Sequence, residues 1–266
     1  MFKRTYKIKK LQKGEIRDLE DVILIEMPIT IKINNDPMVT IICLPRDIKE
    51  LAIGFLFTSG FIDSIEEIVE LEVDKIENEV HITLDKKKAD SIKDFETSSY
   101  NRVIKTSCGI PSVWRDLILN SISKTTETFR DIKVPQGLIF KCIIKMQSQT
   151  TLFKETGGCH GSALFDLNGN LINLFEDIGR HNAIDKVIGS ALINNINLTT
   201  TILCSTGRLT GDSVLKAVRS QIPILASISA PIESGVRIAF SYGVTLIGFV
   251  RGNKMNIYSH PERIIV

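Results

Sequence analysis

One cysteine in this sequence has the surroundings of a nucleophile. Cys108 follows a polar, charged stretch and precedes Gly109, so little side-chain bulk shields its sulfur. Lys105 and Arg102 come shortly before it, and nearby cations stabilise the thiolate, which is the reactive form of cysteine. A helix is predicted after Pro111, and the positive end of its dipole would also stabilise the thiolate. Cys108 is therefore the candidate nucleophile, and the alternative is an exposed cysteine without a role.

The other four cysteines have different surroundings. Cys43, Cys142 and Cys204 each lie among apolar residues in predicted regular elements, which indicates buried packing. Cys159 adjoins His160, and a Cys–His pair can activate sulfur, although neighbours in an extended segment point to opposite sides. The cysteines are widely spaced and include no CxxC motif. We therefore expect reduced thiols in a cytoplasm and no disulfide framework.

A second group of reactive side chains surrounds His181 in the segment EDIGRHNAIDK. This segment lies between a predicted strand and a predicted helix, where open α/β sheets bind ligands, and its side chains can bind anions or transfer protons. The alternative is a network of caps and ion pairs at the helix start. No two His or Cys residues have metal-ligand spacing on one helix, so we predict no metal site. The group consists of Glu176, Asp177, Arg180, His181, Asp185 and Lys186.

Three loops that follow apolar runs contain glycines, cations or both. They are STGRLTGDS, SISAPIESG and GFVRGNKMNIY. Glycine allows backbone N–H groups to approach a phosphate, and arginine can bind it with two parallel hydrogen bonds. No loop matches the Walker A or GxGxxG pattern. Together the loops predict an anionic, nucleotide-like ligand across the strand ends.

Apolar periodicity predicts the elements that position these residues. The segment ITIKINNDPMVTIICL predicts two strands joined at residues 34–37, and PRDIKELAIGFLFTSG predicts a helix that Asp47 caps and Gly60 ends. Asn168-Gly169 predicts a β-hairpin. Further strands are predicted at 68–73, 80–84, 201–204, 222–227 and 245–250, and helices at 113–123, 135–146, 182–193, 212–220 and 233–242.

This alternation of short strands and helices is typical of an α/β fold, and the hairpin that leads into it indicates a mixed sheet. We predict a β-rich N-terminal part over residues 1–130, with a helix and a mobile loop that carries Cys108. Residues 85–107 are polar and are predicted to be an exposed connector. An α/β cofactor-binding domain is predicted over residues 131–266.

Composition indicates an ordinary globular protein. Of 266 residues, 43% are hydrophobic and 24% are charged. No apolar run approaches the roughly 20 residues that cross a bilayer, and no secretory signal is visible, so we expect a cytoplasmic protein without membrane contact. The first 13 residues contain six cations, which we interpret as a solvated, frayed terminus. The rest of the chain then carries a net charge of −4 against +2 for the whole, which argues against nucleic-acid binding.

Several of these segments resemble the formate dehydrogenase accessory sulfurtransferase family (FdhD/NarQ-like). The resemblance is carried by EDIGRHNAIDKVIG, TGGCHGSALFD, STGR, ISAP and LIGFVRGNKMNIYSHPERI. The stretch MPITIKINNDPMVTIICLPRDIKELAIGFLFTSGFI is similar to the family too. The resemblance therefore covers residues from about 24 to 265, which is nearly the whole chain.

The resemblance implies a cytoplasmic sulfurtransferase with a cysteine persulfide intermediate. Such a protein takes sulfur from a cysteine desulfurase and delivers it to the molybdenum (or tungsten) bis-molybdopterin guanine dinucleotide cofactor of formate dehydrogenase. The resemblance also implies a homodimer and a cytidine-deaminase-like fold. In that fold, a mixed-sheet, three-layer α/β/α main domain follows a smaller β-rich part.

The same resemblance implies roles for individual residues. The persulfide cysteine of the family matches Cys108 in the segment TSCG. The cofactor-contacting stretch of the family matches residues 249–254, and we expect the loops near Arg208 and His181 to hold or orient the cofactor. The expected cofactor-binding residues are Phe249, Val250, Arg251, Gly252, Asn253, Lys254, Gly207, Arg208, His181 and Arg180.

Two departures from the family pattern keep alternatives open. Pro111 stands where a second cysteine is usual, so no internal disulfide can resolve a persulfide there, and Cys159 replaces a small polar residue. The zinc signature of deaminases is missing, so a similar fold does not imply deamination. One alternative is a non-catalytic chaperone of the cofactor. The other is a nucleotide-base hydrolase with a metal site at Cys159, His160 and His181.

Overall fold

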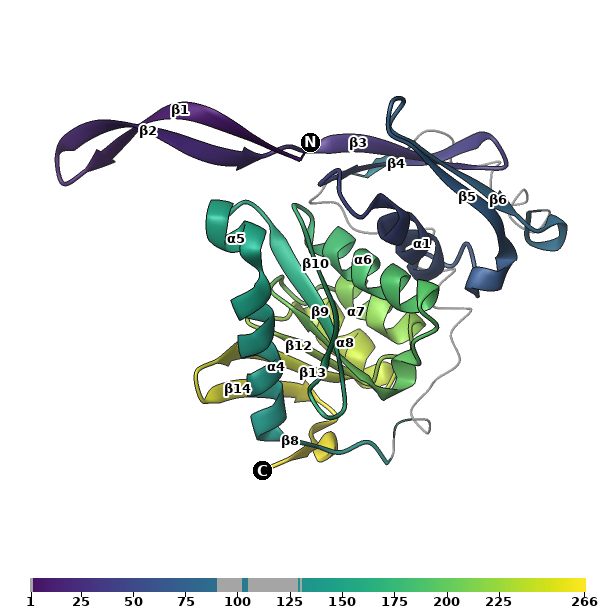
Figure 1. Ribbon diagram of the computed structural model, residues 1–266. Helices are drawn as coiled ribbons and strands as arrows, with labels where there is room; N and C mark the ends of the chain where they lie inside the picture. Colours follow the sequence, from purple (N-terminus) through teal and green to yellow (C-terminus); the bar gives the residue numbers. More distant parts are fainter. Residues whose placement is uncertain (1, 90–101, 105–128, 130) are drawn as a thin grey trace.

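The N-terminal half of the chain forms a five-stranded sheet with a helix packed against it (Figure 1). The computed structural model describes residues 2–89, 102–104, 129 and 131–266. The strand order is β5-β6-β3-β4-β7, and the predicted hairpin at residues 34–37 is confirmed as β3 and β4. Alternate residues such as Ile31 and Ile41 are buried in the core. The strands are β3 (Met27–Ile33), β4 (Asp36–Cys43), β5 (Ile68–Asp74), β6 (Glu79–Leu84) and β7 (Arg102–Ile104).

A long hairpin precedes this sheet and projects from the body of the protein (Figure 1). Its strands β1 (Lys3–Gln12) and β2 (Glu15–Leu24) pair without a register shift, and we call residues 3–24 the arm. The prediction of a frayed N-terminus was therefore wrong. Lys13 and Gly14 both have positive φ, at 52° and 84°, as the tight turn of a two-residue hairpin requires. The dense lysines concealed the alternation of a strand.

Helix α1 (Ile48–Thr58) is mostly buried because it lies between this sheet and helix α6 (Arg180–Ile193). The predicted helix is confirmed, but the predicted cap is wrong. Asp47 has a left-handed backbone with φ of 55°, and its side chain makes no capping hydrogen bond. Its carboxylate lies 3.3 Å from the guanidinium of Arg46 instead. The helix is held by packing and not by its cap.

The C-terminal half forms a six-stranded mixed sheet with the order β10-β9-β11-β12-β13-β14. Strands β11, β12 and β13 are parallel to one another, whereas β9 and β14 are antiparallel to their neighbours. The strands are β9 (His160–Asp166), β10 (Leu171–Asp177), β11 (Thr201–Ser205), β12 (Ile224–Ser227), β13 (Thr245–Arg251) and β14 (Lys254–Ser259). The β9–β10 connection contains Asn168-Gly169, as predicted.

Helices cover both faces of this sheet (Figure 1). Leu203 and Leu225 belong to a core shared with α6, α7 and α8, whereas Ile202 and Ile224 belong to a core shared with α4. The further helices are α4 (Gln136–Gln149), α5 (Thr151–Thr156), α7 (Gly211–Arg219) and α8 (Glu233–Ser241). The predicted mixed α/β architecture is confirmed. The likeness to cytidine deaminases and the division between residues 130 and 131 stay predictions.

Short elements complete the fold. Strand β8 pairs in parallel with β15, and the part of the chain that the structure describes also contains the single-turn helices η1, η2 and η3. Within the described ranges, no helix is both long and apolar enough to span a bilayer. The short elements are β8 (Val134–Pro135), β15 (Ile264–Ile265), η1 (Ile65–Glu67), η2 (Leu198–Thr200) and η3 (Pro261–Arg263).

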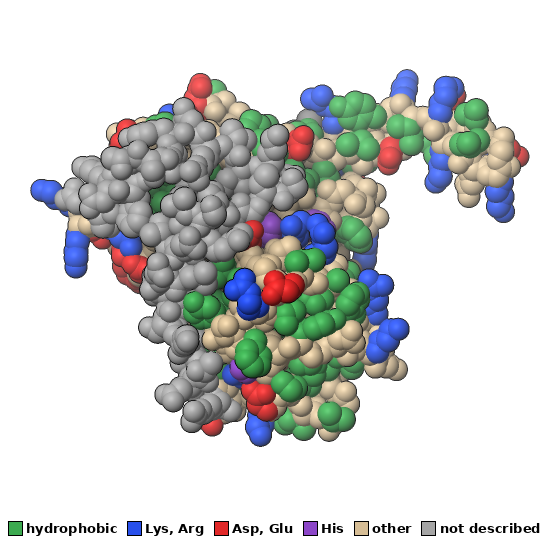
Figure 2. Space-filling view, turned by 180° about the vertical axis from the view of Figure 1, so that it is seen from behind, with side chains coloured by type: hydrophobic (Ala, Val, Ile, Leu, Met, Phe, Trp, Pro, Cys, Tyr) green, Lys and Arg blue, Asp and Glu red, His purple; other side chains and the backbone are tan. Residues whose placement is uncertain are grey.

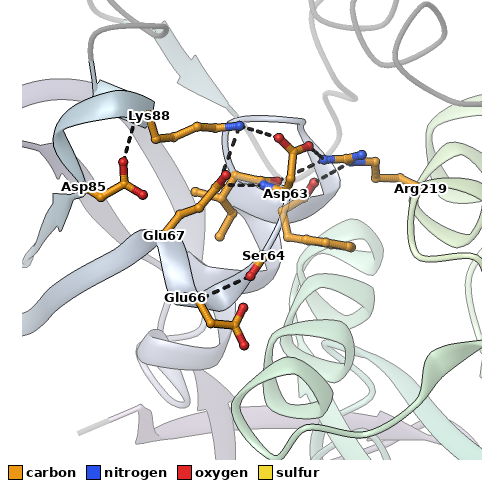
Figure 3. A network of polar contacts seen from close by, with 9 residues as sticks. Asp63, Ser64, Glu66, Glu67, Asp85, Lys88 and Arg219 are labelled. Atoms are coloured by element: carbon orange, nitrogen blue, oxygen red, sulfur yellow. Dashed lines mark hydrogen bonds and ion pairs between the residues drawn. The ribbon is translucent and has the colours of Figure 1, made fainter.

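A polar network ties the N-terminal sheet to α7 (Figure 3). Arg219 forms an ion pair with Asp63 and donates to the carbonyl oxygen of Ile62 at 3.0 Å. On the other side of Asp63, the amine of Lys88 lies 2.6 Å from the carboxylate, and it also lies 3.6 Å from Glu67. The two cations lower the pKa of Asp63, against the opposing effect of partial burial. The two halves of the chain are thus joined by charge as well as by apolar packing.

Candidate functional site

The ends of several strands meet at one edge of the six-stranded sheet. Strands β10 and β11 are both antiparallel to β9 and therefore point the same way as β12 and β13. Their carboxyl ends share an edge with the start of β9, where open α/β sheets bind ligands. The three glycine-containing loops all follow strands at this edge, as the sequence predicted.

Two arginines meet at this edge. Arg180 is the first residue of α6, and Arg208 follows β11. A Cβ atom at Gly207 would lie 2.7 Å from the Cβ of Arg180, so only glycine leaves room for the Arg180 side chain. Burial and the positive charge of Arg208 lower the pKa of Arg180, and Asp212 opposes this effect. The Nε atom of Arg180 is buried without a hydrogen-bond partner.

His181 lies next to Arg180 and is 7% exposed. Its Nε2 atom lies 3.2 Å from the hydroxyl of Thr210, whereas its buried Nδ1 atom has no hydrogen-bond partner. Burial lowers the pKa of His181 to about 3, with further contributions from Lys216 and Arg180. The imidazole is therefore neutral at physiological pH and offers an unsatisfied ring nitrogen beside two cations.

We expect His181→Gln to reduce the loss of stability that acid causes. Below pH 6.5 the unfolded chain protonates this histidine and the folded protein does not, so stability falls as the pH falls. With the pKa of the folded state at about 3, the loss between pH 7 and pH 5 is about 2 kcal/mol. Urea unfolding at both pH values measures it, with His81→Gln as the control. An equal acid-induced loss in the wild type and His181→Gln would contradict this prediction.

His160 at the start of β9 completes a group that we call the cationic cluster: Arg180, Arg208, His160 and His181. The Nδ1 atom of His160 lies 3.2 Å from the hydroxyl of Thr206, which also accepts from the backbone N–H of Gly161 at 3.1 Å. Burial lowers the pKa of His160, and Arg180 adds to that effect. Sequence reasoning considered His160 as a partner of Cys159 or as a metal ligand, and did not place it beside Arg180 and Arg208. The signal was the hairpin register, which pairs His160 with Asp177.

The chemistry of the cationic cluster fits a phosphate or another oxyanion. Two guanidinium groups lie close enough to affect each other, and buried nitrogens of Arg180 and His181 have no protein partner. The cluster lies at the N-terminus of a 14-residue helix, which favours anions through its dipole and its free N–H groups. Figure 2 shows histidine and basic side chains together near the middle of the face that it presents. The nucleotide-like ligand predicted from the sequence suits this arrangement.

Residues 249–254 lie at the same edge, where β13 turns into β14. Phe249 has φ of 54°, a strained value for a residue with a side chain, and the residue is 37% exposed. Its N–H donates to the carbonyl oxygen of Ser229 at 3.1 Å, and Arg251 Nε donates to that of Ile228 at 3.2 Å. Val250, by contrast, is buried beneath α4, so only its backbone is available to a ligand. Gly252, Asn253 and Lys254 are exposed.

The aspartates around His181 form buried ion pairs. Asp177 forms a buried ion pair of 2.7 Å with Lys186, and it accepts from the N–H of Leu44 at 3.1 Å. Asp185 forms a second buried pair of 2.7 Å with Lys216. The buried ion pairs also bind Leu44 and Thr58 of the N-terminal half, whereas Arg180 and His181 face the edge.

Cys159 faces this structural network and not the cationic cluster. It is buried, and its thiol lies 3.6 Å from Glu176 Oε1 as a donor. Burial, followed by the charge of Glu176, raises the pKa of Cys159 to about 12, and burial raises that of Cys43 to about 12. Both thiols are therefore protonated and poor nucleophiles. Cys142 on α4 and Cys204 on β11 are both buried in the core between that helix and the sheet.

Comparisons with known proteins show the family of the chain. The sequence model of the FdhD/NarQ family matches residues 24–265. The chain belongs to the FdhD/NarQ family. It is 37% identical to the sulfur carrier protein FdhD of Sulfolobus acidocaldarius, over 98% of each chain. It is 34% identical to the sulfur carrier protein FdhD of Bacillus subtilis, over 96% of this chain and 95% of that one.

A solved structure has the same fold. The crystal structure of a protein described as a formate dehydrogenase accessory protein, from Desulfotalea psychrophila, aligns with a TM-score of 0.81. The two chains are 29% identical, and each is covered over its full length. Membership of the FdhD/NarQ family, inferred above from short segments, is thus confirmed along the whole chain.

Some predictions lie beyond the part of the chain that the structure describes. Cys108, the nucleophile predicted from the sequence, lies outside the described residues, as do most of the 85–107 connector and the helix predicted at 113–123. Within the described ranges, no group of three or more His, Cys, Asp or Glu side chains is arranged to hold a metal ion. The proposed metal ligands Cys159 and His160 contact Glu176 and Thr206, respectively.

Proposed function

We propose that this protein carries sulfur during the maturation of formate dehydrogenase, in the cytoplasm. Cys108 receives sulfur from the persulfide of a cysteine desulfurase and passes it to the molybdenum (or tungsten) bis-molybdopterin guanine dinucleotide cofactor. The relatives named sulfur carrier proteins support the sulfur chemistry. The cationic cluster supports the proposed binding of the cofactor. Its buried nitrogens without partners and its two neighbouring guanidinium groups suit a phosphate.

The first step is a displacement at sulfur. The Cys108 thiolate attacks the outer sulfur of the donor persulfide; a new S–S bond forms, and the donor cysteine leaves as a thiolate. No net oxidation occurs, because one persulfide replaces another. In the second step the S–S bond on Cys108 breaks and Cys108 leaves as a thiolate. The reduced metal of the acceptor supplies the two electrons that convert the transferred sulfur into sulfide.

The acceptor is bound by the edge residues of the sheet. Arg180 and Arg208 hold phosphate oxygens, and Gly207 lets the Arg180 side chain lie against the loop. His181 contributes its free ring nitrogen to the orientation of the ligand. The exposed residues of the β13–β14 turn, with the Phe249 ring, lie at the same edge and contact the guanine part.

Sulfur loading and cofactor handling can be tested separately. The full-length protein is mixed with a cysteine desulfurase and cysteine, and its peptides are analysed by mass spectrometry without reductant. We expect a gain of about 32 Da, one sulfur atom, on the Cys108 peptide and no gain on peptides of the buried cysteines. Cys108→Ala loses the label, whereas the matched control Cys159→Ala keeps it.

Activation of formate dehydrogenase in cells that lack this protein provides the second measurement. We expect both Cys108→Ala and Arg208→Ala to fail to activate the enzyme, although Arg208→Ala still acquires the sulfur label. If Cys108→Ala supports full activity, the protein is a cofactor chaperone without sulfur chemistry. If Arg208→Ala supports full activity, the cationic cluster is not the acceptor site.

A further inference from the structure

His160 is the member of the cationic cluster to which the proposed function assigns no role. It is the first residue of β9 and lies half-buried at the edge where the strands end. Burial lowers the pKa of its ring, the charges of Arg180 and Arg208 lower it further, and Asp177 opposes them. The carboxylate of Asp177 already pairs with Lys186. His160 is therefore a neutral side chain at physiological pH that lies close enough to both arginines to be affected by their charges.

Thr206 is held in a fixed position beside His160. It follows β11 directly and exchanges two hydrogen bonds with Gly161: its N–H donates to the Gly161 carbonyl oxygen at 2.9 Å, and its hydroxyl oxygen accepts from the Gly161 N–H at 3.1 Å. The carbonyl oxygen of Thr206 accepts from the Ser229 hydroxyl at 2.9 Å, and that of Ser229 accepts from the N–H of Phe249 at 3.1 Å. Neighbouring strands of the sheet thus fix where the Thr206 hydroxyl lies.

The Thr206 hydroxyl determines which nitrogen of His160 carries the proton. Its oxygen already accepts from Gly161, and its single hydrogen remains to be donated. Among the described residues, the acceptor within hydrogen-bond distance of it is Nδ1 of His160, at 3.2 Å. If Nδ1 carried the proton instead, the hydroxyl hydrogen would have no acceptor there. A neutral imidazole that accepts at Nδ1 carries its proton on Nε2, so the hydrogen-bond network assigns the Nε2–H form to His160.

The Nε2–H group is the free end of this ring. No described residue accepts from it, so its proton is available to a ligand. The same cluster contains two buried nitrogens without partners, Nε of Arg180 and Nδ1 of His181. The four side chains of the cluster include no carboxylate, whereas a phosphate has several acceptor oxygens. One phosphate can therefore bind Nε2–H of His160 and a guanidinium group together.

We infer that His160 binds the phosphate at the cationic cluster as a neutral donor through Nε2–H, and that Thr206 is the positioning residue that fixes this tautomer. The inference rests on the proposed function for the chemical class of the ligand, a phosphate of a guanine nucleotide. A neutral donor adds a hydrogen bond to the ligand without adding to the repulsion between Arg180 and Arg208. The cluster then holds its ligand with two cations and not with four.

Two amide substitutions distinguish the two nitrogens of His160. The amide nitrogen of asparagine takes the place of Nδ1, and that of glutamine takes the place of Nε2. Calorimetric titration of the full chain with guanosine diphosphate, the nucleotide part of the proposed cofactor, measures the affinity. We expect His160→Asn to weaken binding at least about tenfold, because a hydrogen bond to a charged group is lost. We expect His160→Gln to stay within about threefold of the wild type, a change of under 1 kcal/mol.

The order of these two variants separates binding from a structural role. If His160 served only to hold Thr206, asparagine would be the better replacement, because it keeps a polar group at the Nδ1 position. His81→Asn, on the N-terminal sheet, is the matched control and is expected to leave the affinity unchanged. Circular dichroism verifies that each variant is folded.

The role of Thr206 has a spectroscopic readout. NMR spectra of protein with isotopically labelled histidine nitrogens show which ring nitrogen carries the proton. We expect Nε2–H on His160 in the wild type and in Thr206→Ser, which keeps the hydroxyl. Thr206→Val lacks the hydroxyl, so a mixture of both tautomers is expected. Its affinity for guanosine diphosphate then falls in proportion to the fraction of Nε2–H that is lost.

Three results would overturn the inference: a proton on Nδ1 of His160 in the wild type, binding by His160→Asn as tight as that of the wild type, or binding by His160→Gln as weak as that of His160→Asn. A wild type that does not bind guanosine diphosphate at millimolar concentration would overturn it as well. Failure of the proposed function gives a different result. If these variants behave as expected and Arg208→Ala still activates formate dehydrogenase, the role of His160 in phosphate binding stands and the cluster is not the acceptor site.

Discussion

Lys216→Met is expected to lower the free energy of unfolding by about 3–5 kcal/mol, because it leaves a buried carboxylate without its partner. Lys216 and Asp185 are both almost fully buried, and the Lys216 amine lies 2.7 Å and 2.8 Å from the two oxygens of Asp185. The amine also donates to the hydroxyl of Thr58 at 2.9 Å. The pair thus connects α7, α6 and α1 in the interior. Denaturant unfolding at pH 7 measures the loss.

Two further variants separate the cost of the stranded charge from that of lost packing. Lys216→Met combined with Asp185→Asn is expected to recover much of the stability, because no unpaired charge remains. Burial already raises the pKa of Asp185, so the single variant is expected to gain stability as the pH falls and that carboxylate becomes protonated. The exposed pair of Lys9 and Asp18 is the control, and Lys9→Met is expected to cost less than about 1 kcal/mol. A loss below that value for Lys216→Met would refute the argument.

Gly189→Ala is expected to destabilise the protein by roughly 3 kcal/mol or to prevent folding, as overpacking of a core does. A Cβ at this position would lie 2.0 Å from the carbonyl oxygen of Glu50 and 2.7 Å from the backbone nitrogen of Gly54. Both contacts are with backbone, so α1 and α6 would have to separate and open the core between them. Thermal or urea unfolding of the variant measures the change.

The sign of the change in stability for Gly189→Ala shows whether overpacking or helix propensity dominates. Alanine is better than glycine inside a helix by about 1 kcal/mol, so a helix free of neighbours would gain stability from the same substitution. Gly137 in α4 provides the matched control, because a Cβ there meets nothing within 4 Å. We expect Gly137→Ala to be neutral or slightly stabilising. If Gly189→Ala behaves like Gly137→Ala, α1 and α6 do not pack closely at Gly189.

Periodicity in the sequence was sufficient to predict most of the six-stranded sheet. Apolar runs at 201–204 and 245–250 have few polar neighbours, because these strands are buried on both faces. β14 was missed, since KMNIYS lies at the sheet edge and is only partly buried. The arm was missed for a related reason: exposed strands carry charges, and periodicity detects burial and not backbone conformation. The Asp47 cap failed because its backbone is left-handed, which residue type alone does not reveal.

Part of the candidate site could also be predicted. Topology places the ends of parallel strands together, so Arg180, Gly207 and Arg208 were predictable as neighbours at one edge. The sequence did not show which charged side chains form internal ion pairs. Asp177 and Lys186 pair with each other, and Lys186 also binds the carbonyl oxygen of Leu44, which lies beside α6 only in the folded protein. The burial of Val250 within the expected cofactor stretch follows from strand alternation, which a motif match ignores. Local patterns identify the edge, and only the assembled core shows which side chains remain free.

The close approach of α1 and α6 at Gly189 and the shared apolar core affect how the chain unfolds. Residues of α1 and of the N-terminal sheet belong to the same cluster as residues of α6, α7 and α8. Leu44, at the end of β4, exchanges hydrogen bonds with Asp177 and Lys186. Neither half can lose its structure without exposing the apolar surface and buried charges of the other. The two parts are expected to unfold as one cooperative unit, and a fragment cut between them would lack the part of the shared cluster that the other half contributes.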